Sequence, residues 1–140
     1  ALNRVISFYP PETRQALFQD LSVAMRAIVS QRLVRSKRGG RVPSVEVLMN
    51  TRHIADLIER GDVQAIKEAM EQSLAPGCQT FEQALYTLHK QGEITLKEAL
   101  ANADSATNLS WLIDNAKVEE VSATRKAEVS GDLASIQLTI

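Results

Sequence analysis

The spacing of apolar residues predicts a short opening segment followed by one long helix. RVISF, at residues 4–8, is typical of a strand, and Pro10 and Pro11 end that segment. After Pro11 the apolar residues recur at helical spacing to about Ser30. The apolar positions of this predicted helix are Leu17, Leu21, Ala24, Met25 and Ile28.

Two strands are predicted next. QRLV at residues 31–34 and VPSVEVLM at residues 42–49 flank the turn signal SKRGGR, in which Gly39 and Gly40 permit a hairpin turn. Alternation places Val45, Val47 and Met49 on one face of the second strand and Ser44, Glu46 and Leu48 on the other. Because two strands alone are marginally stable, helices must cover them or they must belong to a larger sheet.

Five short helices are predicted from Asn50 onward, each preceded by a residue that favours helix N-termini. These capping residues are Thr51, Asp62, Thr80, Thr95 and Ser105. Glu98, three residues after Thr95, is expected to complete a capping box. Trp111 in the last helix is expected to be a core anchor.

The last part of the chain differs in composition. Charged and small residues dominate residues 118–131, which predicts a flexible linker. Residues 132–140 end in alternating apolar and polar side chains, which predicts a tail strand. The pattern as a whole indicates a mainly α fold with a short β hairpin.

Composition and charge narrow the function. A length of 140 residues with 44% apolar residues suits one domain with a real core. The net charge of -1 removes the overall attraction on which most nucleic-acid binders rely. No apolar run approaches the roughly 20 residues of a membrane-spanning helix, and the start lacks the pattern of a secretory signal. The single cysteine fits a reducing cytoplasm, and because the first residue is not Met we expect a fragment of a longer protein.

No motif of a catalytic centre occurs in the sequence. The phosphate-binding pattern GxxxxGK and the patterns GxGxxG, HExxH, CxxC and GxSxG are all absent. His53 and His89 each lack a second ligand at metal-binding spacing, and Cys78 stands alone in a Pro-Gly loop. The sequence therefore predicts neither catalysis nor a metal site in this chain.

A basic cluster is the main irregularity of charge. Its members are Arg26, Arg32, Arg35, Lys37, Arg38 and Arg41, and no acidic residue lies between Asp20 and Glu46. The cluster is a solvated hairpin, an anion site or a contact with an acidic neighbouring subunit. Aromatic residues for stacking on bases are absent there, which disfavours nucleic acid. A helix-turn-helix over the last two helices is also disfavoured, because the second offers no Lys or Arg before Lys117.

Four segments together resemble the twitching-motility retraction ATPases of type IV pili, the PilT/PilU group within the secretion ATPase superfamily. They are LNRVISFYPPETR, AMRAIVSQRLVR, GRVPSVEVLMNT and PGCQTFEQALYTLHKQGEIT, in that order. The resemblance covers about residues 2–113. Residues 52–62, RHIADLIERGD, fall where this family carries Ala-Ile-Arg-Asn-Leu-Ile-Arg-Glu, a segment that retraction needs.

The apolar positions of that segment match the family, but its charges are rearranged. The family's Asn is Asp56 here, and its final Arg-Glu is Glu59-Arg60. This departure and the added tail make the sequence look closer to the accessory PilU-like branch. The candidate force-transmission residues are His53, Ile54, Asp56, Leu57, Ile58, Glu59 and Arg60.

The resemblance implies that residues 1–49 end a RecA-like α/β ATPase core and that residues 50–117 form a helical C-terminal domain. The nucleotide-binding motifs would lie upstream of Ala1, so the intact protein would bind ATP and Mg while this chain binds no cofactor. The implied partners are identical subunits of a hexameric ring, a paralogous retraction ATPase and an inner-membrane pilus platform protein. The implied location is cytoplasmic, peripheral to the inner membrane at the pilus base.

We therefore expect the chain to transmit motion rather than to hydrolyse ATP. Ile54, Leu57 and Ile58 share one helix face and pack whether or not a partner exists. The hypothesis is that the opposite, charged face contacts another subunit or the platform. A second candidate contact is the basic hairpin, formed by Arg32, Arg35, Lys37, Arg38 and Arg41. The alternative is a free-standing helical interaction module or adaptor.

Overall fold

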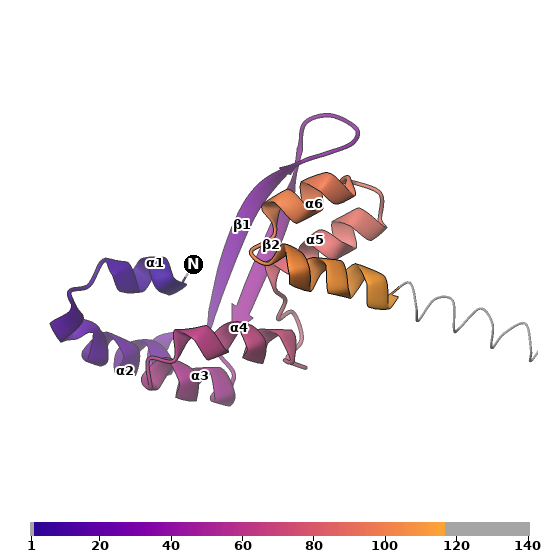
Figure 1. Cartoon of the computed structure of the whole chain (residues 1–140). Helices are drawn as coiled ribbons and strands as arrows, with labels where there is room; N and C mark the ends of the chain where they lie inside the picture. The colour runs from indigo at the N-terminus through magenta and orange to yellow at the C-terminus, as the bar shows by residue number, and fades with distance from the viewer. Residues whose placement is uncertain (1, 117–140) are drawn as a thin grey trace, which may run out of the picture.

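The computed structural model describes residues 2–116, and Figure 1 shows how the elements are arranged. The elements are α1 (Leu2–Ser7), the 3-10 turn η1 (Pro11–Thr13), α2 (Arg14–Ala24), β1 (Ala27–Arg35), β2 (Arg41–Met49), α3 (Arg52–Glu59), α4 (Val63–Glu71), α5 (Phe81–Lys90) and α6 (Leu96–Asn102). A final helix is described over residues 106–116. The predicted fold class, mainly helical with a short hairpin, is confirmed. The predicted linker and tail strand, 118–131 and 132–140, lie outside the described residues.

The first two predictions along the chain need correction. The expected opening strand is the helix α1, because Leu2 and Ile6, one helical turn apart, are both buried on the same core. The long helix expected to reach Ser30 ends at Ala24, and Met25 already has an extended backbone. From Ala27 onward the chain follows the period of a strand, and every second residue faces the helices.

β1 and β2 form an antiparallel hairpin, the one sheet among the described residues. Its register runs from Ala27 opposite Met49 to Arg35 opposite Arg41. Gly39 and Gly40 both have positive φ, as predicted for the turn. The sequence placed the strands correctly but made the first one too short by several residues at its start.

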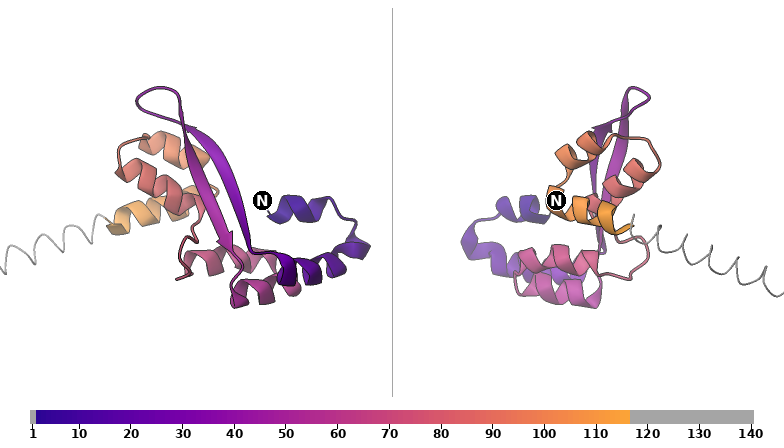
Figure 2. Two further views of the ribbon diagram at one scale, coloured as in Figure 1. Left: turned by 180° about the vertical axis from the view of Figure 1, so that it is seen from behind. Right: turned by 45° about the vertical axis from the view of Figure 1, so that its right-hand side comes forward.

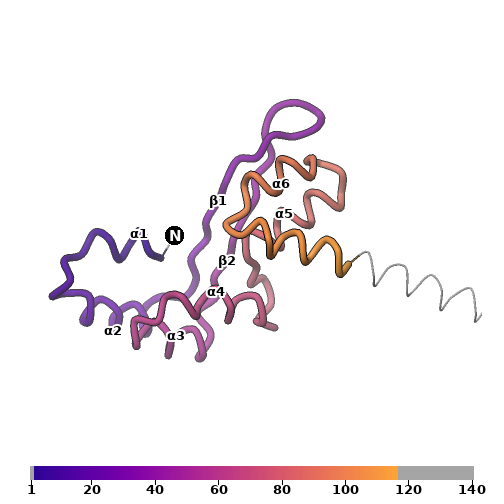
Figure 3. Tube along the Cα trace, in the orientation of Figure 1, coloured from indigo at the N-terminus to yellow at the C-terminus, as the bar shows by residue number. Residues whose placement is uncertain are grey.

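Two separate apolar cores hold the helices to this hairpin. The first core, at the open end of the hairpin, has as its buried members Leu2, Ile6, Leu48, Ile54, Leu57, Ile58, Ile66 and Met70. The second core, beside the turn half of the hairpin, has as its buried members Val34, Leu85, Ile94, Ala99, Leu109 and Ile113. In Figures 1 and 2, α2, α3 and α4 gather at the open end, and α5, α6 and the final helix stack beside the other half. The tube in Figure 3 shows the chain leaving α4 and rising along the hairpin to α5.

This packing crosses the predicted boundary between residues 1–49 and 50–117. α3 and α4 complete the first core together with α1 and α2, while α5 and α6 cover the hairpin. The division into the end of an ATPase core and a C-terminal domain therefore stays a prediction.

The predicted helix caps are present. The side chains of Thr51, Asp62, Thr80 and Thr95 each accept a hydrogen bond from the backbone N–H three residues later. The full capping box, however, belongs to Thr80 with Gln83 rather than to Thr95 with Glu98. The Glu98 carboxylate accepts a hydrogen bond from the side chain of Asn102 instead, at 3.3 Å.

The expectation that Trp111 anchors the core is wrong, because this side chain is 64% exposed. Leu109 and Ile113, one turn apart, occupy the inward face of the final helix. Trp111 lies midway between them in sequence, about 200° from each around the helix, so it points outward. The one tryptophan of the chain thus belongs to the surface.

Gly61 allows α2 to approach the end of α3. Its φ is +71°, and a Cβ atom placed on it would lie 2.9 Å from the Phe18 ring. Both the backbone conformation and the contact therefore require glycine here. Gly92 occupies a similar position after α5, with φ +77° but no neighbouring atom within 4 Å of such a Cβ.

We expect Gly61→Ala to lower the free energy of unfolding by about 2 kcal/mol or more, because a left-handed alanine and a close contact both cost energy. Gly92→Ala is the matched control and should lose only about 1 kcal/mol, the backbone part alone. Urea denaturation of the two variants gives the comparison. Equal losses would mean that the Phe18 ring moves aside at no cost.

Candidate interaction surfaces

α3 is divided sharply into a buried face and an exposed face. Ile54, Leu57 and Ile58 are at most 8% exposed and pack in the first core. The exposed positions are Arg52, His53, Asp56, Glu59 and Arg60, which follow the helical period and form one continuous face. The structure thus separates the predicted force-transmission residues into three packing residues and four surface residues.

The charges of this exposed face are not used within the described part of the chain. No ion pair described there involves Asp56, Glu59 or Arg60. Exposed, unpaired charges of this kind contribute little to stability. They are available to a partner, whereas the buried face fixes their position.

The hairpin turn carries the second predicted surface. Arg35, Lys37, Arg38 and Arg41 are exposed, and Arg35 lies opposite Arg41 in the register. Among these, Arg38 pairs with Glu93 at 3.2 Å. No ion pair of the described residues involves Arg35, Lys37 or Arg41. The turn therefore presents a positive surface that is only partly neutralised by its own chain.

Arg32 does not belong to this surface, although the sequence grouped it there. Its guanidinium forms an ion pair with Asp104, donates to the backbone oxygen of Asn102 at 2.9 Å, and lies 3.9 Å from the centre of the Phe81 ring. Side chains alternate between the two faces of β1, so Arg32 faces the helices while Arg35 faces away from them. Its charge is used to hold the hairpin against the turn before the final helix.

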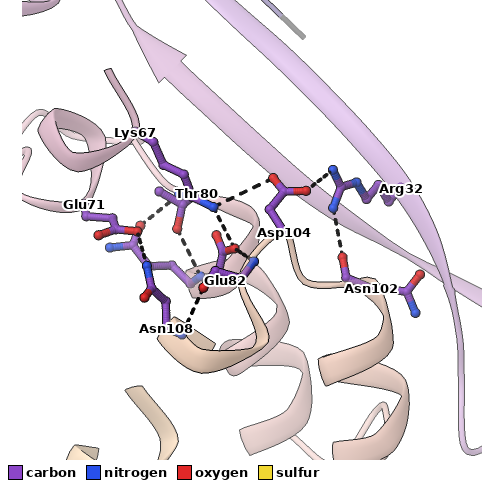
Figure 4. Close-up of polar contacts among 10 residues, drawn as sticks. Arg32, Lys67, Glu71, Thr80, Glu82, Asn102, Asp104 and Asn108 are labelled. Atoms are coloured by element: carbon purple, nitrogen blue, oxygen red, sulfur yellow. Dashed lines mark hydrogen bonds and ion pairs between the residues drawn. The ribbon is translucent and has the colours of Figure 1, made fainter. Parts of the chain in front are cut away.

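A buried carboxylate forms the centre of a polar network that sequence reasoning missed (Figure 4). Glu82 is only 1% exposed, and its Oε1 accepts from Lys67 Nζ at 2.9 Å and from the Ser105 backbone N–H at 2.8 Å. Lys67 Nζ also lies 4.0 Å from Asp104, which pairs with Arg32. An acidic residue in the first turn of a helix after Thr80 was visible in the sequence, but its partners are 15 and 23 residues away.

Glu46 of β2 lies beside this network and has a shifted pKa. Partial burial is the main cause that raises the pKa of its carboxyl, and the nearby carboxylates of Asp104 and Glu82 raise it further. The positive charge of Arg32 acts in the opposite direction. Glu46, Lys67 and Asp104 also line a cavity of about 140 Å³ on the first core.

The exposed side chain of Trp111 lines one groove on the surface. This groove has a volume of about 310 Å³ and is lined by Glu71, Gln72, Gln83, Asn108, Trp111 and Leu112. The groove lies between the end of α4 and the final helix, where the Asn108 side chain donates a hydrogen bond to Glu71 at 3.4 Å.

The remaining candidates acquire no chemical site. His53 is exposed, and His89 lies with Nδ1 3.4 Å from the backbone oxygen of Ile94. Cys78 is partly buried against the first core. Over residues 2–116 no group of His, Cys, Asp and Glu is arranged to hold a metal ion. Every helix in this range is too short or too polar to cross a membrane.

Comparison with known proteins places these surfaces in a family context. The chain is 48% identical to the type IV pilus ATPase PilU of Pseudomonas aeruginosa over 114 residues, which are 81% of this chain and 30% of that protein. It is 28% identical to the type IV pilus retraction ATPase PilT of the same organism, over 76% of this chain and 31% of that protein. No family model matches the chain.

A solved structure agrees with the sequence relatives. The crystal structure of the pilus retraction motor PilT with bound ADP matches with a TM-score of 0.63 and 32% identity, over 74% of this chain and 28% of that one. The resemblance predicted from four short segments is therefore confirmed, and the identity is higher to the PilU than to the PilT of Pseudomonas aeruginosa. The chain spans about 30% of the length of the curated relatives it matches.

We expect Glu46→Gln to stabilise the chain at pH 7 and to have little effect near pH 4. A raised folded-state pKa means that the folded state binds the proton more tightly than the unfolded state. Protonation of Glu46 therefore stabilises the fold fully below the unfolded-state pKa of about 4.3, and this stabilisation is lost as pH rises through the folded-state pKa. Glutamine imitates the protonated carboxyl at every pH. Thermal unfolding from pH 4 to 8 measures the difference, with Glu68→Gln on the exposed side of α4 as control. A difference that stays constant with pH would contradict the assignment.

Proposed function

The chain is related to the PilT and PilU ATPases of type IV pili, and on that premise we propose that it is a C-terminal part of a hexameric pilus retraction motor that transmits motion rather than hydrolysing ATP. In the intact protein ATP and Mg bind to residues outside this chain. The motor works in the cytoplasm, peripheral to the inner membrane at the pilus base, and drives twitching motility.

The geometry of α3 is the observation that supports this proposal most directly. A helix of eight residues is too short to be stable alone, so the first core must hold it. The core fixes Ile54, Leu57 and Ile58, while Asp56, Glu59 and Arg60 point to solvent without described ion pairs. A rigidly held and unpaired charged face is suited to push against a partner. That partner is a neighbouring subunit or the inner-membrane platform protein.

The exposed apolar residues support the view that more protein covers this chain. Phe8, Val23, Val29 and Leu33 are each more than half exposed. Val29 and Leu33 lie on the face of β1 that points away from the described helices. In the proposed motor this face belongs to the larger RecA-like sheet, and the described hairpin is its last part.

The basic turn of the hairpin is proposed as a second contact. Arg35, Lys37 and Arg41 would meet an acidic surface, either on an identical subunit of the ring or on the paralogous retraction ATPase. Charges at the rim of an interface change association rates and salt dependence more than they change folding.

We expect Glu59→Arg and Arg60→Glu in the intact parent protein to impair twitching while the protein remains folded. Both side chains are exposed, so the substitutions change the surface charge and not the core. Twitching zones and pilus retraction events measure the effect, and circular dichroism checks the fold. Leu57→Asp would be a poor test, because Leu57 is only 8% exposed and its loss disrupts the first core.

The matched control is Glu12→Arg, the same reversal at an exposed carboxylate of η1. Normal twitching is expected for this variant. Equal impairment by Glu12→Arg and Glu59→Arg would mean that total charge matters and not the face of α3. Normal twitching of folded Glu59→Arg and Arg60→Glu variants would contradict the proposal.

The isolated 140-residue chain is expected to show no ATPase activity above background. Mg-ATP at millimolar concentration should also leave its melting temperature unchanged, because a ligand that does not bind the folded state cannot stabilise it. Calorimetry with Mg-ADP as a second ligand extends the measurement. A rise in melting temperature with either nucleotide would contradict the assignment of nucleotide binding to residues outside the chain.

A further inference from the structure

A polar layer separates the two apolar cores along the inner face of the hairpin. Each end of this face is apolar: Ile28 and Leu48 reach the first core, and Val34 and Val42 reach the second. The middle is polar, with Ser30 opposite Glu46 and Arg32 opposite Ser44. The two cores share no residue, so the hairpin backbone and this layer lie between them.

Lys67 is the residue by which α4 enters this layer. Its ammonium contacts Glu82 at the start of α5 at 2.9 Å and lies 4.0 Å from Asp104, before the final helix. α4 belongs to the first core, whereas α5 and the final helix belong to the second. A longer hydrogen bond, 3.4 Å, joins Asn108 of the final helix to Glu71 at the end of α4. Figure 4 shows both connections.

The burial of Glu82 makes the Lys67 contact important. A carboxylate that is 1% exposed needs its charge compensated, and removal of one partner of a buried pair leaves an unpaired charge in a poorly solvated site. Glu82 Oε2 and the hydroxyl oxygens of Ser30 and Ser44 are buried without a described partner. The layer is therefore held by few strong contacts, unlike the interdigitated side chains of the cores.

We propose that Lys67 and Glu82 form a latch that makes the two cores move as one body. Glu82 is then a positioning residue: it carries displacement of α3 and α4 to α5 and the final helix. This role rests on the proposed function, since it explains how a push on the charged face of α3 spreads beyond the first core. The apolar packing of α3 on α4 transmits displacement within the first core. The latch then transmits it from α4 to α5.

The sequence provides one natural probe on each side of the latch. Trp111, the single tryptophan, lies on the final helix, two residues from Leu109 and Ile113 of the second core, and its exposed ring also lines the groove against Glu71 of α4. Cys78, the single cysteine, packs against the first core. Through a urea titration, tryptophan fluorescence therefore follows the final helix, and the reaction rate of the thiol with Ellman's reagent follows the first core. With the latch intact, we expect one shared unfolding midpoint, as for a cooperative unit.

Two single variants break the latch in different ways. Lys67→Met keeps the stem of the side chain and removes its charge, while Glu82→Gln keeps an oxygen that accepts from the Ser105 N–H and loses the ion pair. In both variants, the urea midpoint measured by Trp111 fluorescence should differ from the midpoint measured by Cys78 reactivity. Lys97→Met, the same change at an exposed lysine of α6, should leave them together.

The double variant Lys67→Met/Glu82→Gln distinguishes coupling from simple destabilisation. With both charges absent, much of the stability lost in Lys67→Met should return, because no unpaired buried charge remains. The two midpoints should nevertheless stay apart. Coincident midpoints in the double variant would overturn the latch.

The double variant and the Lys97→Met control, made in the intact parent protein, test whether the latch is needed for motion. We expect the double variant to keep its ATP turnover and to lose twitching, whereas the Lys97→Met protein twitches normally. Unchanged twitching of the double variant would overturn the role of Glu82 as a positioning residue. The two proposals can fail independently. Normal twitching of the α3 charge-reversal variants, together with separated urea midpoints of the latch variants, would contradict the proposed motor function but support the coupling of the two cores.

Discussion

The arrangement of this chain depends on how the polar middle of one hairpin is neutralised. The hairpin is long enough to serve two apolar cores, one at each end, but Ser30, Arg32, Ser44 and Glu46 lie between them on the same face. Arg32 there pairs with Asp104 before the final helix and lies over the Phe81 ring of α5, while Lys67 of α4 and Glu82 of α5 pair with each other beside it. These contacts join the elements of the two apolar cores across the polar middle of the hairpin.

The first core gives the structure a helix with two different faces. α3 has only two turns, and its order comes from burial of Ile54, Leu57 and Ile58 rather than from its own propensity. Gly61 ends the helix and lets the Phe18 ring of α2 pack closely beside it. The side chain of Asn50 donates to the backbone oxygens of Ser22 and Met25, both at 2.9 Å, and so ties the end of α2 to the start of α3. The charged face of α3 is therefore presented by a rigid support.

The relation to the type IV pilus ATPases gives these features a common explanation. The chain shares 48% identity with PilU of Pseudomonas aeruginosa and 28% with PilT of the same organism, yet it spans about 30% of either protein. Two of its exposed apolar side chains, Val29 and Leu33, lie on the outward face of β1, and Leu74, Leu96 and Trp111 lie on other parts of the surface. The described surfaces that carry unpaired charge, on α3 and at the hairpin turn, lie on different elements. In the proposed motor, one of these surfaces would receive motion and the other would pass it on.

The sequence by itself determined the local structure and the family. Caps at Thr51, Asp62, Thr80 and Thr95 and the period of α3 depend on residues a few positions apart, so they could be predicted. The buried and exposed faces of α3 followed for the same reason. Two local predictions were wrong: the opening strand is a helix, with Leu2 and Ile6 buried one turn apart, and Trp111 faces outward.

Only the tertiary structure decided which charges meet. Arg32 looked like its neighbours in a basic cluster, but it faces Asp104, a residue 72 positions later. Glu82 looked like an ordinary acidic residue in the first turn of a helix, but folding buries it and brings Lys67 and the Ser105 N–H to it. Pairings of this kind follow from the packing of whole elements, and no local pattern of residue types encodes them.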